Sequence, residues 1–284
     1  MAHKIGILGM GSIGSRHAEN LKKLGCEIFP YDPAGSLCTR DEALDRSDAI
    51  VIASPTNQHY NDLADALATK KPVFCEKPIA HVAHHSFSRT AMVGYNLRFH
   101  PCVIAAKEWV GQIGTIFSAD FMCAQYNDKY KDNVVLNWSH EIDLAHYLLG
   151  QPNYASIMPL GIFDKQKDTH VSAKVIWALQ GKPTLVTMHL DYLANPEIRQ
   201  FLIIGSEGQI IVDLYGRQSW LRDTRGQVID TIDETYTSYD DDYLDEMKEF
   251  IGILEGDRPY NRGCNGEEAL QALETCRSIM DRLK

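Results

Sequence analysis

The chain has 284 residues, of which 44% are hydrophobic and 23% are charged, and its net charge is −10. This balance is typical of globular proteins, and the acidic charge argues against binding to a nucleic-acid backbone. No apolar run reaches the roughly 18 residues of a membrane-spanning helix, and the first strand begins too early for a signal peptide. The seven cysteines are scattered without a CxxC pair, which favours reduced thiols in a cytoplasmic protein over disulfides or a zinc site.

The first predicted elements are a buried strand, a glycine-rich turn and a helix over residues 13–24. The glycines follow the GxGxxG spacing: Gly9 permits a tight turn, Gly11 lets the backbone approach a pyrophosphate, and Gly14 lets the helix pack closely on the strand. The start of the helix directs free N–H groups at the phosphates. The alternative is a glycine turn that binds no dinucleotide. The predicted phosphate-binding residues are Gly9, Met10, Gly11, Ser12, Ile13 and Gly14.

A second apolar strand at 27–29 leads to Asp32, near the distance expected for a ribose-binding acid. Its carboxylate can accept hydrogen bonds from the ribose hydroxyls and repels a 2′-phosphate. Arg40 is the first arginine that follows, eight residues on. These residues favour NAD over NADP, although Asp32 can also simply cap the turn at Pro33.

The N-terminal part continues as alternating strands and helices, the pattern of a doubly wound parallel sheet. Gly25 is expected to end the first helix. The segments expected to follow are a helix at 41–44, strands at 49–53, 72–75 and 91–95, and a helix through Leu63 and Leu67.

Residues 99–284 predict an α+β domain with an open, largely antiparallel sheet. Turn signals such as the one at 205–208 separate its predicted strands. Helices are expected to end at Gly150 and to cover about 240–255 and 265–283. The acidic run at 240–242 suits the solvated start of a helix. The expected strands lie near 115–126, 169–180, 183–194, 200–204, 209–214 and 227–232. We predict a dinucleotide-binding domain at 1–98 and a substrate-binding and oligomerisation domain at 99–284.

An ordered set of motifs over nearly the whole chain resembles the glucose–fructose oxidoreductase / inositol dehydrogenase (Gfo/Idh/MocA) family. The motifs are the glycine loop, the segment 54–59, Glu76-Lys77-Pro78, the segment 94–101 and the segment 139–143, with support from 205–208. The resemblance implies an N-terminal Rossmann domain, an open-faced sheet domain and bound NAD(P). It also implies a polyol or sugar substrate, and a homodimer or homotetramer built partly through the sheet.

Oxidation of a secondary alcohol needs a hydride acceptor, here the nicotinamide, and a base for the hydroxyl proton. Lys77 follows the carboxyl end of a strand, where open α/β sheets bind ligands, and its ammonium can hold the substrate oxygen. His140 is the best candidate for proton transfer because histidine titrates near neutrality. The alternative is that it caps the helix and bonds Asp143, which can equally orient the imidazole.

The family motifs extend the site to further residues. Arg98 suits an anionic ligand group, with a structural ion pair as an equal alternative. Tyr192 is a weaker candidate for contact with the substrate. Additional cofactor-binding residues are Ser54, Pro55, Thr56, Asn57, His59, Glu76 and Lys77, and the predicted substrate-binding residues are Tyr95, Asn96, Arg98, His100, Asp143 and Tyr126.

The chain departs from the family pattern in two places. Asn137 stands near the position where family dehydrogenases commonly carry an aspartate; asparagine can bond a hydroxyl but cannot accept its proton. The connection 79–92 is short, and its His81, His84 and His85 fit a solvated crossover better than a metal site.

These observations predict an NAD-dependent oxidoreductase that transfers a hydride between nicotinamide and a secondary alcohol of a sugar, cyclitol or activated sugar, with Lys77, His140 and Asn137 as the catalytic set. The alternatives are a non-enzymatic NAD-binding sensor, an epimerase or hydrolase that uses NAD transiently, and an interaction protein with an empty Rossmann fold.

Overall fold

The computed structural model describes residues 2–35, 38–80, 91–127, 133–256 and 261–283. The chain forms two compact units. Unit 1 comprises Met1–Phe99 and Tyr239–Leu270, and unit 2 comprises His100–Ser238 and Gln271–Lys284. A segment distant in sequence therefore packs with the N-terminal sheet, while a functional boundary at residue 98 stays a prediction.

The sheet of unit 1 has the strand order β14-β5-β4-β3-β1-β2, in which β14 runs antiparallel to β5 and the other neighbours are parallel. Strands β3, β4 and β5 are buried throughout, as expected for strands covered on both faces. The strands are β1 (Lys4–Leu8), β2 (Glu27–Tyr31), β3 (Ala49–Ile52), β4 (Val73–Glu76), β5 (Ala91–Gly94) and β14 (Cys264–Asn265).

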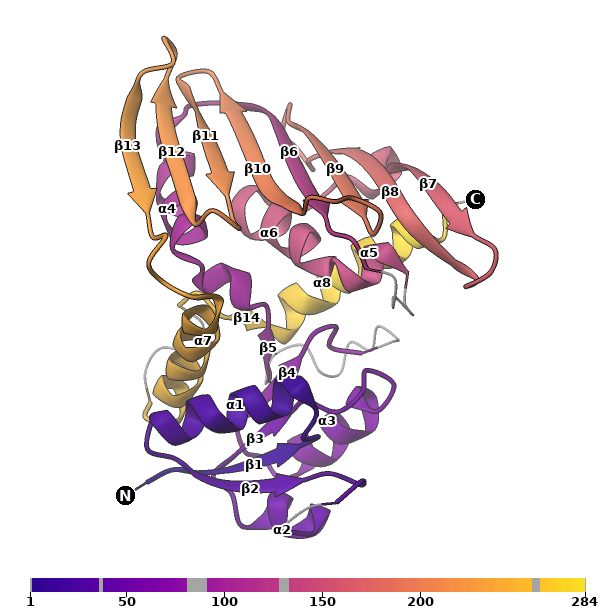
Figure 1. Ribbon diagram of the computed structural model, residues 1–284, viewed down its shortest axis with the longest axis vertical. Helices are drawn as coiled ribbons and strands as arrows, with labels where there is room; N and C mark the ends of the chain where they lie inside the picture. Colours follow the sequence, from indigo (N-terminus) through magenta and orange to yellow (C-terminus); the bar gives the residue numbers. More distant parts are fainter. Residues whose placement is uncertain (1, 36–37, 81–90, 128–132, 257–260, 284) are drawn as a thin grey trace. The chain divides into compact units, whose positions relative to one another are not determined.

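The helices of unit 1 begin and end at recognisable signals. Gly25, with φ of +82°, follows the end of α1 as predicted, and Thr39 with Glu42 forms a capping box at the start of α2. Figure 1 shows α1 and α7 on one side of the sheet and α2 on the other. The elements are α1 (Ser12–Lys23), α2 (Arg40–Asp45), α3 (His59–Ala68), η2 (Asn96–Phe99), α7 (Tyr239–Leu254) and the first part of α8 (Gly266–Met280).

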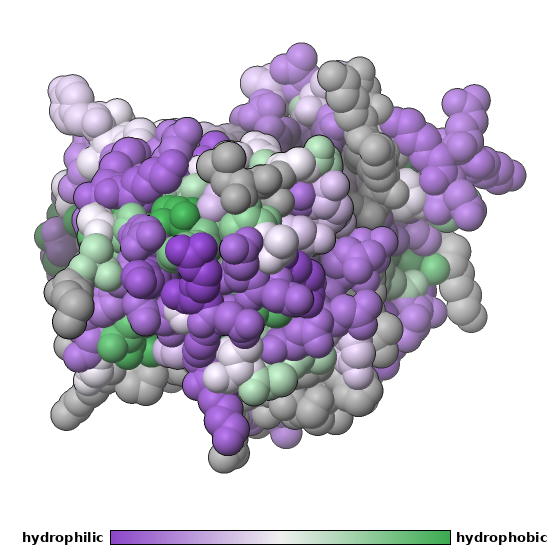
Figure 2. Space-filling model, turned by 90° about the horizontal axis from the view of Figure 1, so that it is seen from below, coloured by the Kyte–Doolittle hydropathy of each residue, from purple (hydrophilic) through white to green (hydrophobic). Residues whose placement is uncertain are grey.

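The core of unit 1 joins the sheet to α7. Ile5, Val51 and Phe74 from the strands pack in one cluster with Met247 and Phe250 from α7. Burial of these apolar side chains accounts for the membership of α7 in this unit. Seen from below, the molecule presents mainly hydrophilic side chains, with hydrophobic ones in small separate areas (Figure 2).

The sheet of unit 2 has the strand order β13-β12-β11-β10-β6-β9-β8-β7. Strands β6 and β9 run parallel, and the other neighbouring pairs are antiparallel. The predicted fold class, a parallel Rossmann-like sheet plus a largely antiparallel sheet, is confirmed. The strands are β6 (Ile116–Ala124), β7 (Met158–Asp164), β8 (Thr169–Ala178), β9 (Leu185–Asp191), β10 (Ile198–Gly205), β11 (Gly208–Asp213), β12 (Gln218–Asp223) and β13 (Val228–Asp233).

Helices cover one face of this second sheet (Figure 1). Gly150, with φ of +107°, follows the end of α6, as predicted. The elements are α4 (Pro101–Trp109), η3 (Val110–Gln112), α5 (Val134–Asn137), α6 (Ser139–Leu149), η4 (Tyr154–Ser156) and the last part of α8. In the described part of the chain, no helix has the length and apolar character needed to cross a membrane.

Several elements were not predicted. Strand β14 has two residues, and β7 is an edge strand with exposed residues on both faces, so neither shows the alternation of a half-buried strand. Helix α4 begins with Pro101 at its first turn and His100 as its cap, a signal that was available in the sequence. The acidic start of α7 was predicted as solvated. Asp240 and Asp241 are exposed as predicted, but Asp242 is 1% exposed.

Candidate functional site

The three glycines of the loop after β1 meet different steric demands. Gly9 has φ of +95°, and a Cβ there would lie 2.5 Å from the nitrogen of Ser54. A Cβ on Gly14 would collide with the carbonyl oxygen of Gly9, whereas a Cβ on Gly11 would meet no described atom within 4 Å. Gly9 and Gly14 therefore serve the fold itself, and the open space at Gly11 suits a ligand that approaches the backbone.

Helix α1 begins at this loop with an N-terminus that is favourable to anions. Gly11 is its N-cap, no described side chain caps it, and the first turn holds no acidic residue. The N–H groups of Ser12, Ile13 and Gly14 have no acceptor within the helix itself. Together with the helix dipole they fit a pyrophosphate.

Asp32 lies beside the same loop. Its Oδ2 accepts the N–H of Met10 at 2.8 Å, and its Oδ1 accepts the N–H of Ala34 at 2.8 Å. These two backbone hydrogen bonds lower the pKa of the carboxyl group. Asp32 therefore caps the turn at Pro33, as one of its two predicted roles required. As an anion it keeps further lone pairs that can accept hydrogen bonds from the ribose hydroxyls.

Arg40, the first arginine after Asp32, is bound by two carboxylates of α3. Its terminal nitrogens lie 2.8 Å from Asp62 and 2.8 Å from Asp65. The other oxygen of Asp62 accepts the hydroxyl of Ser54 at 2.6 Å. The guanidinium is thus already paired within unit 1.

The loop at 54–59 is held through the His59 ring, which is 1% exposed. Its Nε2 lies 2.8 Å from the carbonyl oxygen of Ser54, and its Nδ1 lies 2.8 Å from that of Pro78. His59 therefore braces the loop from inside. Pro55 and Asn57 are exposed and Thr56 is partly exposed, so these three are the accessible members of the predicted set.

Glu76 ends β4 and Lys77 follows it. The Glu76 side chain is buried, with Oε1 2.7 Å from Nε2 of His17 and Oε2 accepting the backbone N–H of Lys77 at 3.1 Å. Lys77 itself is partly exposed. The buried carboxylate therefore fixes the backbone of Lys77 at the carboxyl edge of the sheet, where open α/β sheets bind their ligands.

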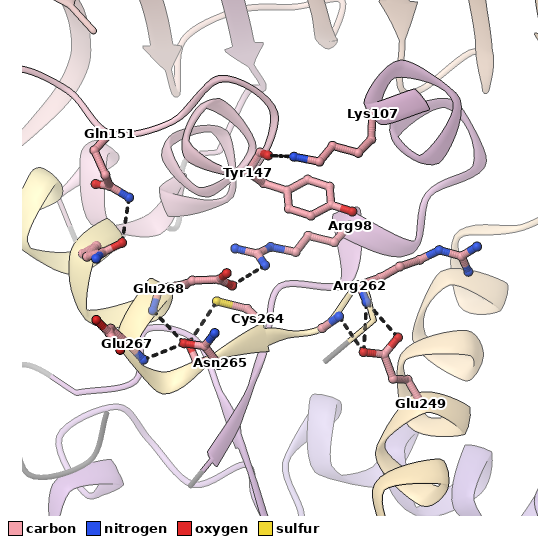
Figure 3. A network of polar contacts seen from close by, with 12 residues as sticks. Arg98, Lys107, Tyr147, Gln151, Glu249, Arg262, Cys264, Asn265, Glu267 and Glu268 are labelled. Carbon is pink, nitrogen blue, oxygen red and sulfur yellow. Dashed lines mark hydrogen bonds and ion pairs between the residues drawn. The ribbon is translucent and has the colours of Figure 1, made fainter. Parts of the chain in front are cut away.

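Arg98, at 2% exposure, donates to Glu268 of α8 at 2.6 Å (Figure 3). The start of α8 is capped by Asn265, whose side-chain oxygen accepts the N–H groups of Glu267 and Glu268. The structural ion pair that the sequence allowed for Arg98 is thus present within unit 1, and its role toward a ligand stays a prediction.

Tyr95 and Asn96 follow β5, and each is 1% exposed. Both the oxygen and the nitrogen of the Asn96 carboxamide lack a hydrogen-bond partner among the described residues. Burying an unpaired donor or acceptor costs about 1–3 kcal/mol for each group. A ligand that pairs with this amide would remove the cost.

His100 belongs to unit 2 and is held by two backbone contacts. Its Nδ1 accepts the N–H of Cys102 at 3.2 Å, and its Nε2 lies 3.1 Å from the carbonyl oxygen of Leu214. Burial lowers its pKa to about 3. His100 is therefore a neutral capping residue of α4, and its contact with a substrate stays a prediction.

The predicted proton-transfer residues lie around the start of α6 in unit 2. Asn137 ends α5, and His140 and Asp143 lie in the first turns of α6, 6% and 1% exposed. Their spacing of three places them on the same helical face. Between them Glu141, also buried, accepts from Nε of Arg199 on β10 at 2.6 Å. This ion pair anchors the turn that carries His140.

The two tyrosines proposed for the second domain differ in exposure. Tyr126, after β6, is 56% exposed, whereas Tyr192, after β9, is 1% exposed. The ring of Tyr192 packs 5.9 Å from that of Trp138, centroid to centroid. Tyr126 is therefore accessible, whereas Tyr192 is buried and its role in the site stays a prediction.

The structure brings the predicted residues together in two groups. The cofactor residues and Lys77 lie at the carboxyl ends of β1 to β5 in unit 1, and Asn137, His140 and Asp143 lie at α6 in unit 2. His81, His84 and His85 lie outside the described residues. His17 and Arg199 were not predicted, since neither stands in a motif. The one available signal was that His17 follows Gly14 by a single turn of the same helix.

Comparisons with known proteins agree on the N-terminal fold. Residues 25–92 match the model of an oxidoreductase family with an NAD-binding Rossmann fold. An inositol 2-dehydrogenase from Rubrobacter xylanophilus is 26% identical over 179 residues, which cover 51% of this chain and 52% of that protein. A scyllo-inositol 2-dehydrogenase (NAD(+)) from Bacillus subtilis is 24% identical over 295 aligned positions, covering 88% of this chain and 86% of that protein. The chain thus matches about half the length of the first relative and most of the second.

Among solved structures, levoglucosan dehydrogenase in complex with NADH and levoglucosan superposes with a TM-score of 0.82. The two chains are 17% identical, and the match covers 99% of this chain and 97% of that one. At this identity the likeness shows that the fold is shared over the whole length.

Proposed function

This chain belongs to the Gfo/Idh/MocA family of oxidoreductases, and from that premise we propose that it is an NAD-dependent dehydrogenase. The proposed reaction moves a hydride between nicotinamide and a secondary alcohol of a sugar, cyclitol or activated sugar. The glycine loop carries the proposal, because its backbone is open at Gly11 and leads into an uncapped helix. Such a cradle fits a dinucleotide pyrophosphate.

NAD is the proposed cofactor in preference to NADP. The Asp32 carboxylate beside Met10 would repel a 2′-phosphate. Arg40, the cation nearest in sequence after it, already pairs with Asp62 and Asp65. A 2′-phosphate would therefore meet a fixed negative charge and would compete with two carboxylates for the arginine.

For the chemistry, the nicotinamide ring supplies the hydride acceptor when it is bound. We propose that the Lys77 ammonium holds the reacting oxygen and stabilises its alkoxide character, and that His140 accepts the hydroxyl proton. Asp143, three residues further on α6, orients the imidazole. Asn137 donates a hydrogen bond to a substrate hydroxyl, which its amide can do without changing charge.

The inositol and levoglucosan dehydrogenases among the similar proteins support a polyol or sugar as the substrate class. We propose Tyr95, Asn96, Arg98, His100, Asp143 and Tyr126 as residues that bind or shape the substrate site. Asn96 has the strongest support of these, because its buried amide lacks a partner among the described residues.

An NAD-binding sensor is the second candidate, and Asn137 is the observation that favours it. A site with an amide in place of a carboxylate loses one proton acceptor. On this reading the protein binds NAD without turnover, and Asn137→Asp would create activity. An epimerase or hydrolase that uses NAD transiently would instead retain the cofactor through purification and release no NADH.

The test is to incubate the purified protein with NAD and a panel of inositols, sugars, sugar acids and nucleotide sugars, and to follow NADH absorbance. Lys77→Ala should abolish the turnover. Lys22→Ala, which removes an exposed lysine at the other end of α1, should retain it. If no compound of the panel gives NADH while calorimetry shows NAD binding, the result would favour the sensor or the enzyme that uses NAD transiently.

We also propose that the protein forms a homodimer through the face of the unit 2 sheet opposite its helices. A cavity on this sheet is lined by residues such as Leu160, Ile176 and Leu202, and Leu160 is 78% exposed. Apolar patches of this kind mark interfaces. Sedimentation velocity should give a dimer for the wild type and for Tyr236→Glu, which alters a loop, and a monomer for Leu160→Glu. A monomeric wild type would refute the proposal.

A further inference from the structure

We propose that His17 is a positioning residue for the catalytic turn: its imidazole on α1 holds the buried Glu76 carboxylate, which in turn holds the backbone of Lys77. The inference rests on the proposed function of Lys77 and assigns a role to a residue outside every motif.

The contacts leave the Glu76 carboxylate little freedom. Its Oε1 lies 2.7 Å from Nε2 of His17, and its Oε2 accepts the N–H of Lys77 at 3.1 Å. Gly94 stands opposite on β5, where a Cβ would lie 3.0 Å from both carboxylate oxygens. A buried carboxylate needs hydrogen-bond donors to remain charged, and His17 is the side chain that provides one here.

The surroundings of His17 leave Glu76 as the one hydrogen-bond partner of its ring among the described residues. The residue is 0% exposed, and its Nδ1 has no hydrogen-bond partner among the described residues. Its ring packs edge-on against Phe74 and Tyr243, with centroids 5.1 Å and 5.9 Å away. The two rings therefore hold the imidazole with its Nε2 at the carboxylate, to which the Nε2–H donates.

The charged and titratable groups around this pair come from three elements. Strand β4 and its following turn contribute Glu76 and Lys77. Helix α7 contributes Tyr243, whose pKa is raised by burial and, to a smaller extent, by Tyr239, Glu76 and Glu246. Helix α1 contributes Arg16, whose guanidinium lies 4.8 Å from the centre of the Tyr243 ring. Tyr243 stays neutral, so Glu76 is the charge in direct hydrogen-bond contact with His17.

The helix that carries His17 gives the contact its functional meaning. His17 lies five residues after Ser12, about 7.5 Å along α1. The same helix therefore presents free N–H groups to the pyrophosphate at its start and contacts the Glu76 carboxylate through His17 about one and a half helical turns later. We infer that α1 sets the position of the Lys77 backbone relative to the bound dinucleotide.

The test compares two substitutions of His17. His17→Gln keeps an N–H donor that can reach Glu76, and His17→Met fills a similar volume without a donor. We expect His17→Met to lower kcat by about 10- to 100-fold, the scale of a small misplacement of a catalytic group. The KM for NAD should stay within about threefold, because the glycine loop is unchanged. His17→Gln should recover most of the lost kcat.

The split between kcat and KM and the recovery in His17→Gln separate positioning from simple destabilisation. A merely destabilised protein would lose activity in proportion to its loss of folded molecules, whichever side chain replaced His17. Equal losses of kcat in both variants, following their melting temperatures, would overturn the proposal.

Two readouts do not depend on turnover, so failure of the proposed function would be recognised separately. Nitrogen NMR of the wild type should show a proton on Nε2 of His17 that is hydrogen-bonded to a carboxylate, and an Nε2 without a proton would overturn the proposal. The resonance of reductively methylated Lys77 should change in His17→Met and be restored in His17→Gln. An unchanged Lys77 resonance in both variants would equally refute the link between the two residues.

Discussion

The Nε of Arg199 on β10 lies 2.6 Å from a carboxylate oxygen of Glu141 on α6, and the two side chains are 6% and 2% exposed. Glu141 is the neighbour of His140, so a buried ion pair tethers the first turn of α6 to the sheet. The guanidinium also lies 5.6 Å from the centre of the Trp138 ring, in the residue that precedes α6. The proposed base thus sits on a turn fixed from two sides.

Arg199→Met should lower the free energy of unfolding by about 3–5 kcal/mol, because it leaves the Glu141 carboxylate buried without its counter-charge. The double variant Arg199→Met with Glu141→Leu should recover part of that loss. Urea unfolding of the two single variants and the double variant measures the coupling. Strictly additive losses would mean that the pair contributes no interaction of its own.

Gly14→Ala and Gly11→Ala should fail in different ways. A Cβ at position 14 collides with the Gly9 carbonyl oxygen, so Gly14→Ala should reduce stability as well as NAD binding. A Cβ at position 11 meets no described atom within 4 Å, so Gly11→Ala should fold normally and bind NAD more weakly. Calorimetric titration and thermal unfolding measure both effects. Gly111→Ala is the matched control, since a Cβ there also meets no described atom within 4 Å. Unaltered NAD binding by Gly11→Ala would contradict the proposed pyrophosphate cradle.

Asp32→Asn should change cofactor selection. The variant keeps a side-chain oxygen that can accept the Met10 N–H but loses the charge that opposes a 2′-phosphate. We expect the ratio of the NADP and NAD dissociation constants to fall by about tenfold, equivalent to 1.4 kcal/mol. Fluorescence titration with both reduced cofactors measures the ratio, with Asp48→Asn, a substitution on an exposed acid, as the comparison. An unchanged ratio would show that Asp32 only caps its turn.

His100 should make the protein less stable in acid. Its folded pKa of about 3 lies below the unfolded value of about 6.5, so the unfolded state binds the additional proton between these values. Stability from this group is therefore complete above pH 6.5 and declines as the pH falls toward 3, by up to about 1.4 kcal/mol per pH unit. His100→Asn, which retains a capping side chain but does not titrate, should flatten the decline. Urea unfolding at pH 7 and pH 5 tests this, and equal slopes for variant and wild type would refute the assignment.

The sequence by itself determined the elements whose causes are local. The glycine spacing after an apolar strand, the acid after the second strand and Gly25 after the first helix specify the start of the Rossmann fold, because backbone sterics and hydrogen bonding act over a few residues. The family motifs placed Lys77 at a strand end and His140 at a helix start, and the structure has both there. Strand β14 and edge strand β7 were not predicted from the sequence, because burial does not alternate along their residues.

The tertiary structure alone decided which distant residues meet. His17 and Glu76 are 59 positions apart, and Glu141 and Arg199 are 58 apart, so no local pattern pairs them. The association of α7 with the N-terminal sheet likewise depends on Met247, Phe250 and Ile251 completing a core whose other buried members precede residue 100. Such contacts follow from the topology that buries the most apolar surface, a property of the whole chain. For this reason the proposed chemistry of Lys77 and His140 could be inferred from their own positions in the sequence, whereas the buried polar contacts beside their turns appear only in the folded molecule.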